Sequence, residues 1–149
     1  MQNNAVQSSK ENSECFYCSK NVDKLMIEAA KLKVSTLYLN KDQTHQGRCI
    51  VAFDRHVTEI FHLDDKEQQL FIEDVSQTAR MLHEVFHPDK INYGIYGDLV
   101  SHLHVHIVPK YEQSDEWGEA FVNAPPSKKM LDPLGYQEII MSIQAKLNP

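Results

Sequence analysis

The sequence is poor in the features that mark membrane, secreted and nucleic-acid-binding proteins. Its longest apolar run falls far short of the roughly 20 residues that span a bilayer, and its polar first residues contain no apolar core of a secretory signal. Only three cysteines are present, an odd number that favours the reducing cytoplasm. Basic residues number 15 against 21 acidic ones, so the net charge is −6, and neither a nucleic-acid polymer nor an anionic membrane is an expected partner. These absences leave a globular, cytoplasmic protein as the expectation.

The length and composition fit one domain. A chain of 149 residues with 42% apolar residues can bury a core without disulfides. Residues 1–13 are polar and aperiodic, and they predict a flexible N-terminal tail that leaves residues 14–149 as the single domain. No internal repeat, low-complexity tract or linker in the sequence indicates a second domain.

Short runs of β-forming residues predict the strands. Four such runs stand out: 34–39, 49–53, 91–96 and 102–108. The first two are joined by a polar, turn-like connection, which favours an antiparallel hairpin, and the fourth is expected to end at Pro109. Residues 22–32 are weakly amphipathic and predict a short helix or an irregular segment, while residues 115–124 predict a loop or strand with aromatic side chains.

The clearest helix is predicted over residues 65–87. Apolar side chains recur there at three- to four-residue spacing and form one stripe, namely Phe71, Val75, Ala79, Leu82 and Phe86. Asp64 and Glu67 have the spacing of a capping box, and Pro88 ends the helix. A last helix is expected from residue 132 or 133 to about 147. The expected fold class is therefore α+β, a mainly antiparallel sheet of about five strands with the long helix packed on one face.

Three histidines alternate along the fourth predicted strand. His102, His104 and His106 share one face, roughly 7 Å apart, because strand side chains alternate. An imidazole near neutral pH can donate or accept a proton or bind a metal. Three readings are open at this point: a solvent-facing row, a catalytic metal site, and a substrate-binding site with acid–base or nucleophilic chemistry. The segment 107–110 that ends the strand offers no carboxylate to complete a metal site.

The segment His102-Leu-His-Val-His-Ile-Val108 resembles the signature of the histidine-triad (HIT) family, in which histidines alternate with apolar residues. The resemblance extends through Asn92-Tyr-Gly94 and Gly97-Asp98 to the 40–56 stretch, and it covers about residues 15–122. It implies a HIT-like fold, a homodimer and an enzyme. In that family's reaction, His104 attacks the α-phosphate of a nucleotide derivative and forms a covalent nucleotidyl-histidine intermediate.

The same resemblance implies the nucleotide contacts. His106 would bond the phosphoryl or leaving oxygen as charge develops, Asn40 would contact the ribose hydroxyls, and Asn92 would contact a phosphate. Backbone N–H groups of residues 98–100 would complete the phosphate cradle. The sequence departs from the family pattern at two of these positions, since Leu99 replaces a hydroxyl residue and Asp98 replaces an amide.

A separate motif, Cys15-x-x-Cys18, has the spacing of half a zinc site, with a redox pair as the alternative. The resemblance to zinc-bearing HIT proteins implies that His56 and His102 supply the other two ligands. Such a Cys₂His₂ set is closed, so the zinc would be structural. His102 would then be a ligand and not a catalyst.

These patterns predict a HIT-type hydrolase or nucleotidyltransferase whose substrate is a purine-nucleotide conjugate or a dinucleoside polyphosphate. Two alternatives stay open, a nucleotide-binding adaptor or sensor without turnover and a metal-dependent hydrolase that uses the triad as ligands. Trp117 is the only tryptophan and lies in an acidic loop. It could stack on a base, cover a pocket or anchor the core.

Overall fold

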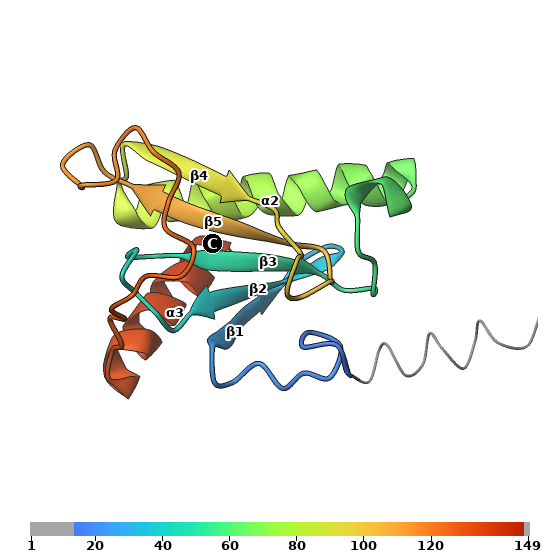
Figure 1. Cartoon of the computed structure of the whole chain (residues 1–149), viewed down its shortest axis with the longest axis horizontal. Coiled ribbons are helices and arrows are strands. Elements are labelled where there is room, and N and C mark those ends of the chain that lie inside the picture. The colour runs from blue at the N-terminus through green and yellow to red at the C-terminus, as the bar shows by residue number, and fades with distance from the viewer. Residues whose placement is uncertain (1–13, 148–149) are drawn as a thin grey trace, which may run out of the picture.

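Five antiparallel strands form one sheet in the order β1-β2-β3-β5-β4 (Figure 1). The computed structural model describes residues 14–147, so the tail predicted over residues 1–13 lies outside the described residues. The strands are β1 Met26–Lys31, β2 Ser35–Asn40, β3 Cys49–Phe53, β4 Lys90–Gly94 and β5 His104–Lys110. A short 3₁₀ helix η1 (Ile60–His62) precedes α2 (Asp65–Phe86), and α3 (Pro133–Leu147) closes the chain. The α+β prediction and the 34–53 hairpin are confirmed.

Both helices cover the same face of the sheet. The main core lies between them and the alternate strand residues that face them, among which are Leu37, Val51, Val105 and Ile107. The predicted capping box begins α2, because the Asp64 side chain accepts from Glu67 N–H and the Glu67 side chain accepts from Asp64 N–H. His87 ends the helix in the left-handed conformation, with φ of 50°. None of the helices in the described part of the chain is long and apolar enough to cross a membrane.

A buried carboxylate fastens α2 to the β1–β2 turn. Asp74 is fully buried, and it accepts hydrogen bonds from the backbone N–H groups of Lys33 and Val34 at 3.0 Å each. Its third donor is the buried Ser35 hydroxyl, at 2.6 Å. Three donors satisfy a carboxylate that has no water around it, so this contact fixes the helix against the sheet.

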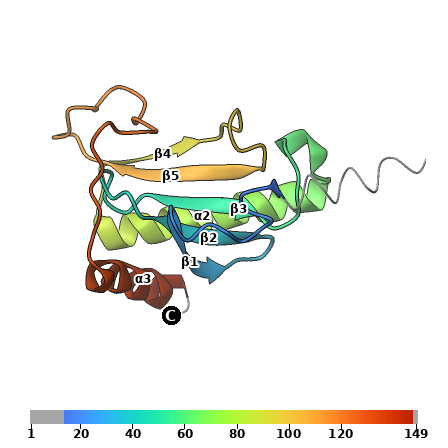
Figure 2. The same cartoon turned by 60° about the horizontal axis from the view of Figure 1, so that its bottom comes forward.

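The opposite face of the sheet is covered by the segment that precedes β1. In Figure 2 this blue segment crosses in front of β2 and β3, while α2 lies behind them. Its Tyr17 and Val22 form a second apolar cluster with Met26, Tyr38, Ile50 and Ala52 of the sheet. In the β3–β5 register, Ala52 pairs with His104 and Ile50 with His106. The two histidines therefore lie on the face that the helices do not cover.

Three boundaries differ from the predictions. Residues 26–31 form a strand and not a helix or irregular segment, because they pair with β2 along a ladder whose register shifts between Glu28 and Ala30. The triad strand begins at His104 and continues through Pro109 to Lys110. The sheet tolerates this proline because the pairing of β5 with β3 ends at Ile107, so that Pro109 has only β4 as a neighbour. The strand predicted over residues 91–96 ends at Gly94, whereas residues 115–124 form a loop, which is one of the two predicted alternatives.

Candidate functional site

The four predicted metal ligands come together at the edge of this face. The ligand atoms of Cys15, Cys18, His56 and His102 all lie within 4.8 Å of one another. His102 Nδ1 is 3.3 Å from Cys15 Sγ and 3.5 Å from Cys18 Sγ, and His56 Nδ1 is 3.3 Å from Cys18 Sγ. The Cys15–Cys18 turn brings both thiols to one side, and the bend that precedes β5 brings in His102.

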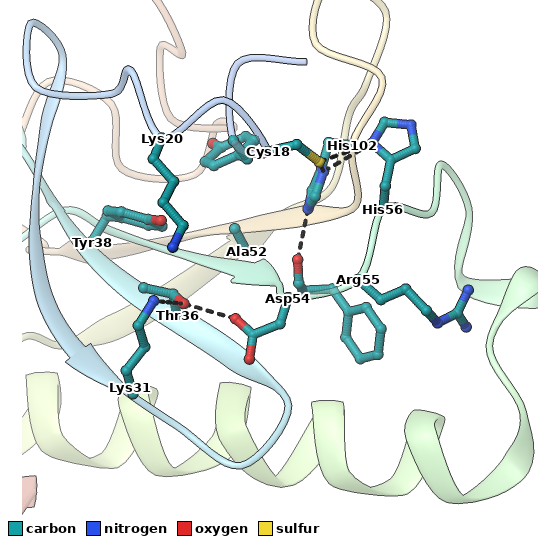
Figure 3. A pocket seen from close by; sticks show the side chains of 12 residues that line it. Cys18, Lys20, Lys31, Thr36, Tyr38, Ala52, Asp54, Arg55, His56 and His102 are labelled. Atoms are coloured by element: carbon teal, nitrogen blue, oxygen red, sulfur yellow. Dashed lines mark hydrogen bonds between the residues drawn. The ribbon is translucent and has the colours of Figure 1, made fainter. Parts of the chain in front are cut away.

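The donor set fits a metal ion chemically. His102 Nε2 lies 2.6 Å from the Phe53 carbonyl oxygen and must donate to it, so Nδ1 keeps its lone pair and faces the cysteines. Figure 3 shows the His102 ring beside Cys18 and His56, with dashed lines for the contacts of its nitrogens. Histidines that bind metal through one ring nitrogen usually donate a hydrogen bond from the other to a carbonyl or carboxylate oxygen, which fixes the ring. A hollow of about 600 Å³ lies beside the cluster, with Lys31, Thr36 and Asp54 among its lining residues.

His104 is held in one tautomer by its own strand. Its Nδ1 lies 2.6 Å from the His102 carbonyl oxygen and donates to it. The other ring nitrogen, Nε2, therefore carries a lone pair. Burial lowers the pKa of His104 below its usual value, so the imidazole is neutral at physiological pH. A neutral imidazole with a free lone pair on a fixed ring is a competent nucleophile.

Tyr17 forms a wall against the triad. It lies between the two cysteines in the sequence, and its ring centroid is 5.2 Å from that of His102 and 5.1 Å from that of His104. The side chain is 7% exposed and lines both the hollow beside the cluster and the cavity described next. Burial raises the pKa of its hydroxyl, which stays protonated.

His106 contacts a buried arginine. Arg48 Nη2 lies 3.1 Å from His106 Nδ1, and Asn123 holds the same guanidinium through its carbonyl and side-chain oxygens at 2.8 and 2.7 Å. Burial, the Arg48 charge and His104 together lower the pKa of His106 to about 3. The third histidine is therefore neutral throughout the physiological range.

A cavity of about 530 Å³ opens over His104 and His106. Its apolar side is made by Phe16, Tyr17, Ile50 and Tyr96, and its polar side includes Arg48 and Asn123. The loop that follows β4 supplies one rim, residues 96–100, and the end of β2 supplies another at Asn40. Concave sites of this size with a few convergent polar groups are the usual form of small-molecule sites.

The structure brings most of the predicted nucleotide contacts to this cavity. Asn40, Asp98 and Leu99 line it, whereas Asn92 lies in β4 and is not among its lining residues. Leu99 is 99% exposed at the rim of the cavity. Trp117 is 41% exposed and belongs neither to the core nor to this cavity.

Comparison with known proteins identifies the family. The model of the HIT domain matches residues 21–113. The chain belongs to the HIT family. An uncharacterised HIT-like protein of Mycoplasma genitalium is 28% identical over 114 residues, which cover 71% of this chain and 79% of the relative. The Bacillus subtilis protein named hit is 25% identical over 145 residues, which cover 89% and 98%.

The fold of the HIT family is also found among solved structures. A histidine triad protein from Bradyrhizobium japonicum superposes with a TM-score of 0.77 and 24% identity, over 85% of this chain and 94% of that one. At that identity the likeness establishes the fold alone.

Sequence reasoning missed Arg48, Tyr17 and Asn123. Arg48 stands between a turn and an apolar strand, where an arginine is ordinarily exposed, and it is 4% exposed here. Tyr17 was detectable only as the aromatic residue inside the Cys15–Cys18 motif. Asn123 lies 75 residues from Arg48 in the chain, so only the fold reveals their contact.

Proposed function

We propose that this HIT-family protein is a nucleotide hydrolase or nucleotidyltransferase that acts on the α-phosphate of a purine-nucleotide conjugate or a dinucleoside polyphosphate. The observation that carries the proposal is His104, whose Nδ1–H is held by the His102 carbonyl while its ring lines the cavity. The free Nε2 is then the nucleophile.

The reaction has two displacements. His104 Nε2 attacks the α-phosphorus, a P–N bond forms, and the P–O bond to the leaving group breaks with its electron pair on that oxygen. The positive charge on the imidazole is spread toward the Nδ1–H that the His102 carbonyl accepts. Water or another hydroxyl acceptor then attacks phosphorus and loses its proton to solvent, and the P–N bond breaks with its electron pair on Nε2. Neutral His104 returns, and the departed oxygen takes up a proton from solvent.

His106 acts beside the nucleophile in this scheme. The two ring centroids are 5.1 Å apart, so a phosphate on His104 lies within reach of His106 Nε2. An N–H at that nitrogen donates to the phosphoryl or leaving oxygen as negative charge develops. Leu99 has no hydroxyl, so the side chain at this position supplies no proton to the leaving group.

The remaining contacts follow the walls of the cavity. Asn40 contacts the ribose hydroxyls, and the backbone N–H groups of residues 98–100 face the phosphates. The Asp98 side chain is exposed, which lets the carboxylate point away from phosphate charge. The Asn92 contact with phosphate stays a prediction from the family resemblance.

A structural zinc held by Cys15, Cys18, His56 and His102 is part of the proposal. When bound, the ion supplies no reaction chemistry but fixes the N-terminal segment to the bend before the triad strand. His102 Nδ1 faces the cysteines while His106 Nδ1 faces Arg48, so the three histidines do not converge on one ion. This geometry favours the nucleophile over a metal site built from the triad.

We also propose a cytoplasmic homodimer. β4 is an edge strand of the sheet, and it carries an exposed tyrosine, Tyr93, at 55%. On α2, Ile72 is exposed at 59%. Apolar side chains on an unpaired edge and on the neighbouring helix are suited to burial against a second copy.

The test is intact mass spectrometry of the full chain, quenched during turnover of an adenylyl conjugate. We expect an added nucleotidyl group that peptide mapping places on His104. His104→Ala should abolish turnover and leave AMP binding and the fold intact, because no metal ligand is removed. His62→Ala, which removes an exposed histidine of η1, is the matched control and should keep wild-type turnover. Near-normal turnover by His104→Ala, or an adduct on another residue, contradicts the scheme, and AMP binding without turnover by the wild type identifies an adaptor.

A further inference from the structure

The buried arginine beside the triad has an unusual environment. Arg48 is 4% exposed, and no carboxylate among the described residues lies within 4.0 Å of its guanidinium. Its partners are neutral, namely two oxygens of Asn123, the Nδ1 of His106, and the face of the Phe121 ring at 5.3 Å. Its Nε has no hydrogen-bond partner among residues 14–147. An unpaired charge in this position is costly to stability, which points to a role in the site and not in the fold.

The contact between Arg48 and His106 has only one possible direction. A guanidinium has five N–H donors and no acceptor. Arg48 Nη2 must therefore donate, and His106 Nδ1 must accept with an unprotonated lone pair. The single proton of the neutral ring is left on Nε2.

We propose that Arg48 is a positioning residue that holds His106 as the Nε2–H tautomer, so that His106 presents a permanent hydrogen-bond donor to the reacting phosphate. This inference rests on the function proposed above. It names Arg48 as the residue that fixes which nitrogen of His106 carries the proton. The negative phosphate would add to the charge of Asp42, which lines the same cavity and interacts electrostatically with the buried guanidinium without forming an ion pair.

The rest of the His106 environment agrees with this role. On β5 the facing titratable group is His104, and the register places Ile50 of β3 and Gly94 of β4, neither of which titrates, opposite His106. The Tyr96 ring lies at 5.9 Å and the apolar Phe121 ring at 6.2 Å. No carboxylate of the described residues forms an ion pair with His106, so Arg48 is the charged group that directs its ring.

Asn123 keeps the guanidinium in place. Its two oxygens take one N–H from each terminal nitrogen of Arg48, a forked contact that fixes the plane of the group. The loop of residues 115–124 thereby reaches the triad through Arg48. A second N–H of Nη2 is then directed to His106.

The first test needs no substrate. Long-range ¹H–¹⁵N correlation spectra of the full-length, zinc-loaded protein report which nitrogen of each histidine carries hydrogen. In the wild type we expect His106 to show an unprotonated Nδ1 and a protonated Nε2 from pH 8 to pH 5. In Arg48→Met the His106 signals should become those of two exchanging tautomers. Arg48→Lys keeps a donor without an acceptor and should restore part of the single-tautomer spectrum.

The second test is kinetic. Removing a fixed donor from a phosphoryl site costs on the order of 10²-fold in kcat, so Arg48→Met should lower kcat by about 10- to 100-fold with a smaller change in KM. Arg55→Met is the matched control, because Arg55 is an exposed arginine paired with Glu67, and it should leave both the spectrum and kcat unchanged.

Two results overturn the inference. One is a wild-type His106 that carries a proton on Nδ1 at pH 6, which is decisive even if Arg48→Met fails to fold. The other is an Arg48→Met protein that loses the tautomer but keeps wild-type kcat, since His106 would then need no positioning. Failure of the proposed function is seen separately, as a wild type with the expected spectrum and no turnover of any nucleotide conjugate.

Discussion

The low pKa of His106 makes the stability of this protein depend on pH in a way that one substitution removes. The folded protein keeps His106 neutral because its pKa is about 3, whereas in the unfolded chain the imidazole titrates near 6.5. Between these values the unfolded state binds more protons than the folded state. Stability therefore rises with pH across this window, and it falls as the pH drops below about 6.5.

The magnitude follows from the two pKa values. At pH 5 the unfolded state gains about 2 kcal/mol from protonating this one histidine, and at pH 6 about 1 kcal/mol, while the folded state gains almost nothing. His106 is 8% exposed, so solvent screening does little to reduce the effect. His106→Asn is the suitable variant, because its side-chain oxygen takes the place of Nδ1 as the acceptor for Arg48.

The assay is urea denaturation of both proteins at pH 7.5, 6 and 5, at one protein concentration and in excess zinc. Other titrating groups act equally in the two proteins, so the difference between the pH dependences isolates His106. Between pH 7.5 and pH 5 the wild type should lose about 2 kcal/mol more unfolding free energy than His106→Asn. Parallel pH dependences within about 0.5 kcal/mol would refute the reasoning, since His106 would then titrate alike in both states.

Three further outcomes follow from the site and the core. The purified protein should carry about one zinc per chain by elemental analysis, and Cys15→Ser should lose both the ion and unfolding free energy. A wild type that is as stable without metal as with added zinc would exclude the site. Asp74→Ala leaves three donors unpaired and should cost about 3 kcal/mol in chemical denaturation, against almost none for the exposed Asp115→Ala; equal effects would contradict the buried anchor. His106→Ala should lower kcat on the order of 10²-fold with a smaller change in KM, and equal changes in both would indicate a uniform binding role.

The elements with a strong local pattern were predictable from the sequence. The α2 stripe and its Asp64–Glu67 cap depend on residues close together in the chain, and the structure reproduces them, whereas the left-handed conformation of His87 at the helix end was not predicted. The alternation of the triad strand likewise placed His104 and His106 together. Local pattern was enough here because each of these features is encoded within a few residues.

The β1 strand was not predictable in this way. Residues 26–31 contain Glu28, Ala29 and Ala30, which do not favour strands, and the register shift between Glu28 and Ala30 breaks the alternation that would reveal one. Pairing with β2 overrides the local preference.

Arg48 could not be predicted from the sequence for a different reason. The metal ligands were found because two cysteines stand three positions apart and a family pattern supplied the histidines. Arg48 has no such signature, since its role depends on a histidine 58 residues further along the chain. Burial of a charge is a property of the tertiary structure, and the sequence favours an exposed arginine at that position.

The position of Tyr17 makes the shape of the cavity depend on the folding of the Cys15–Cys18 turn. The residue that separates the two cavities is carried between Cys15 and Cys18, so the wall stands only while the turn is folded. If the turn came away from the sheet, the hollow and the cavity would join, and water would reach the ring of His104 from the side that Tyr17 now covers. A chelator would then stop turnover without removing any atom that takes part in the reaction. A zinc ion held by the proposed ligands would keep Tyr17 in place beside His104, and a loss of turnover on chelation would then report the opening of the cavity and not the loss of a catalytic metal.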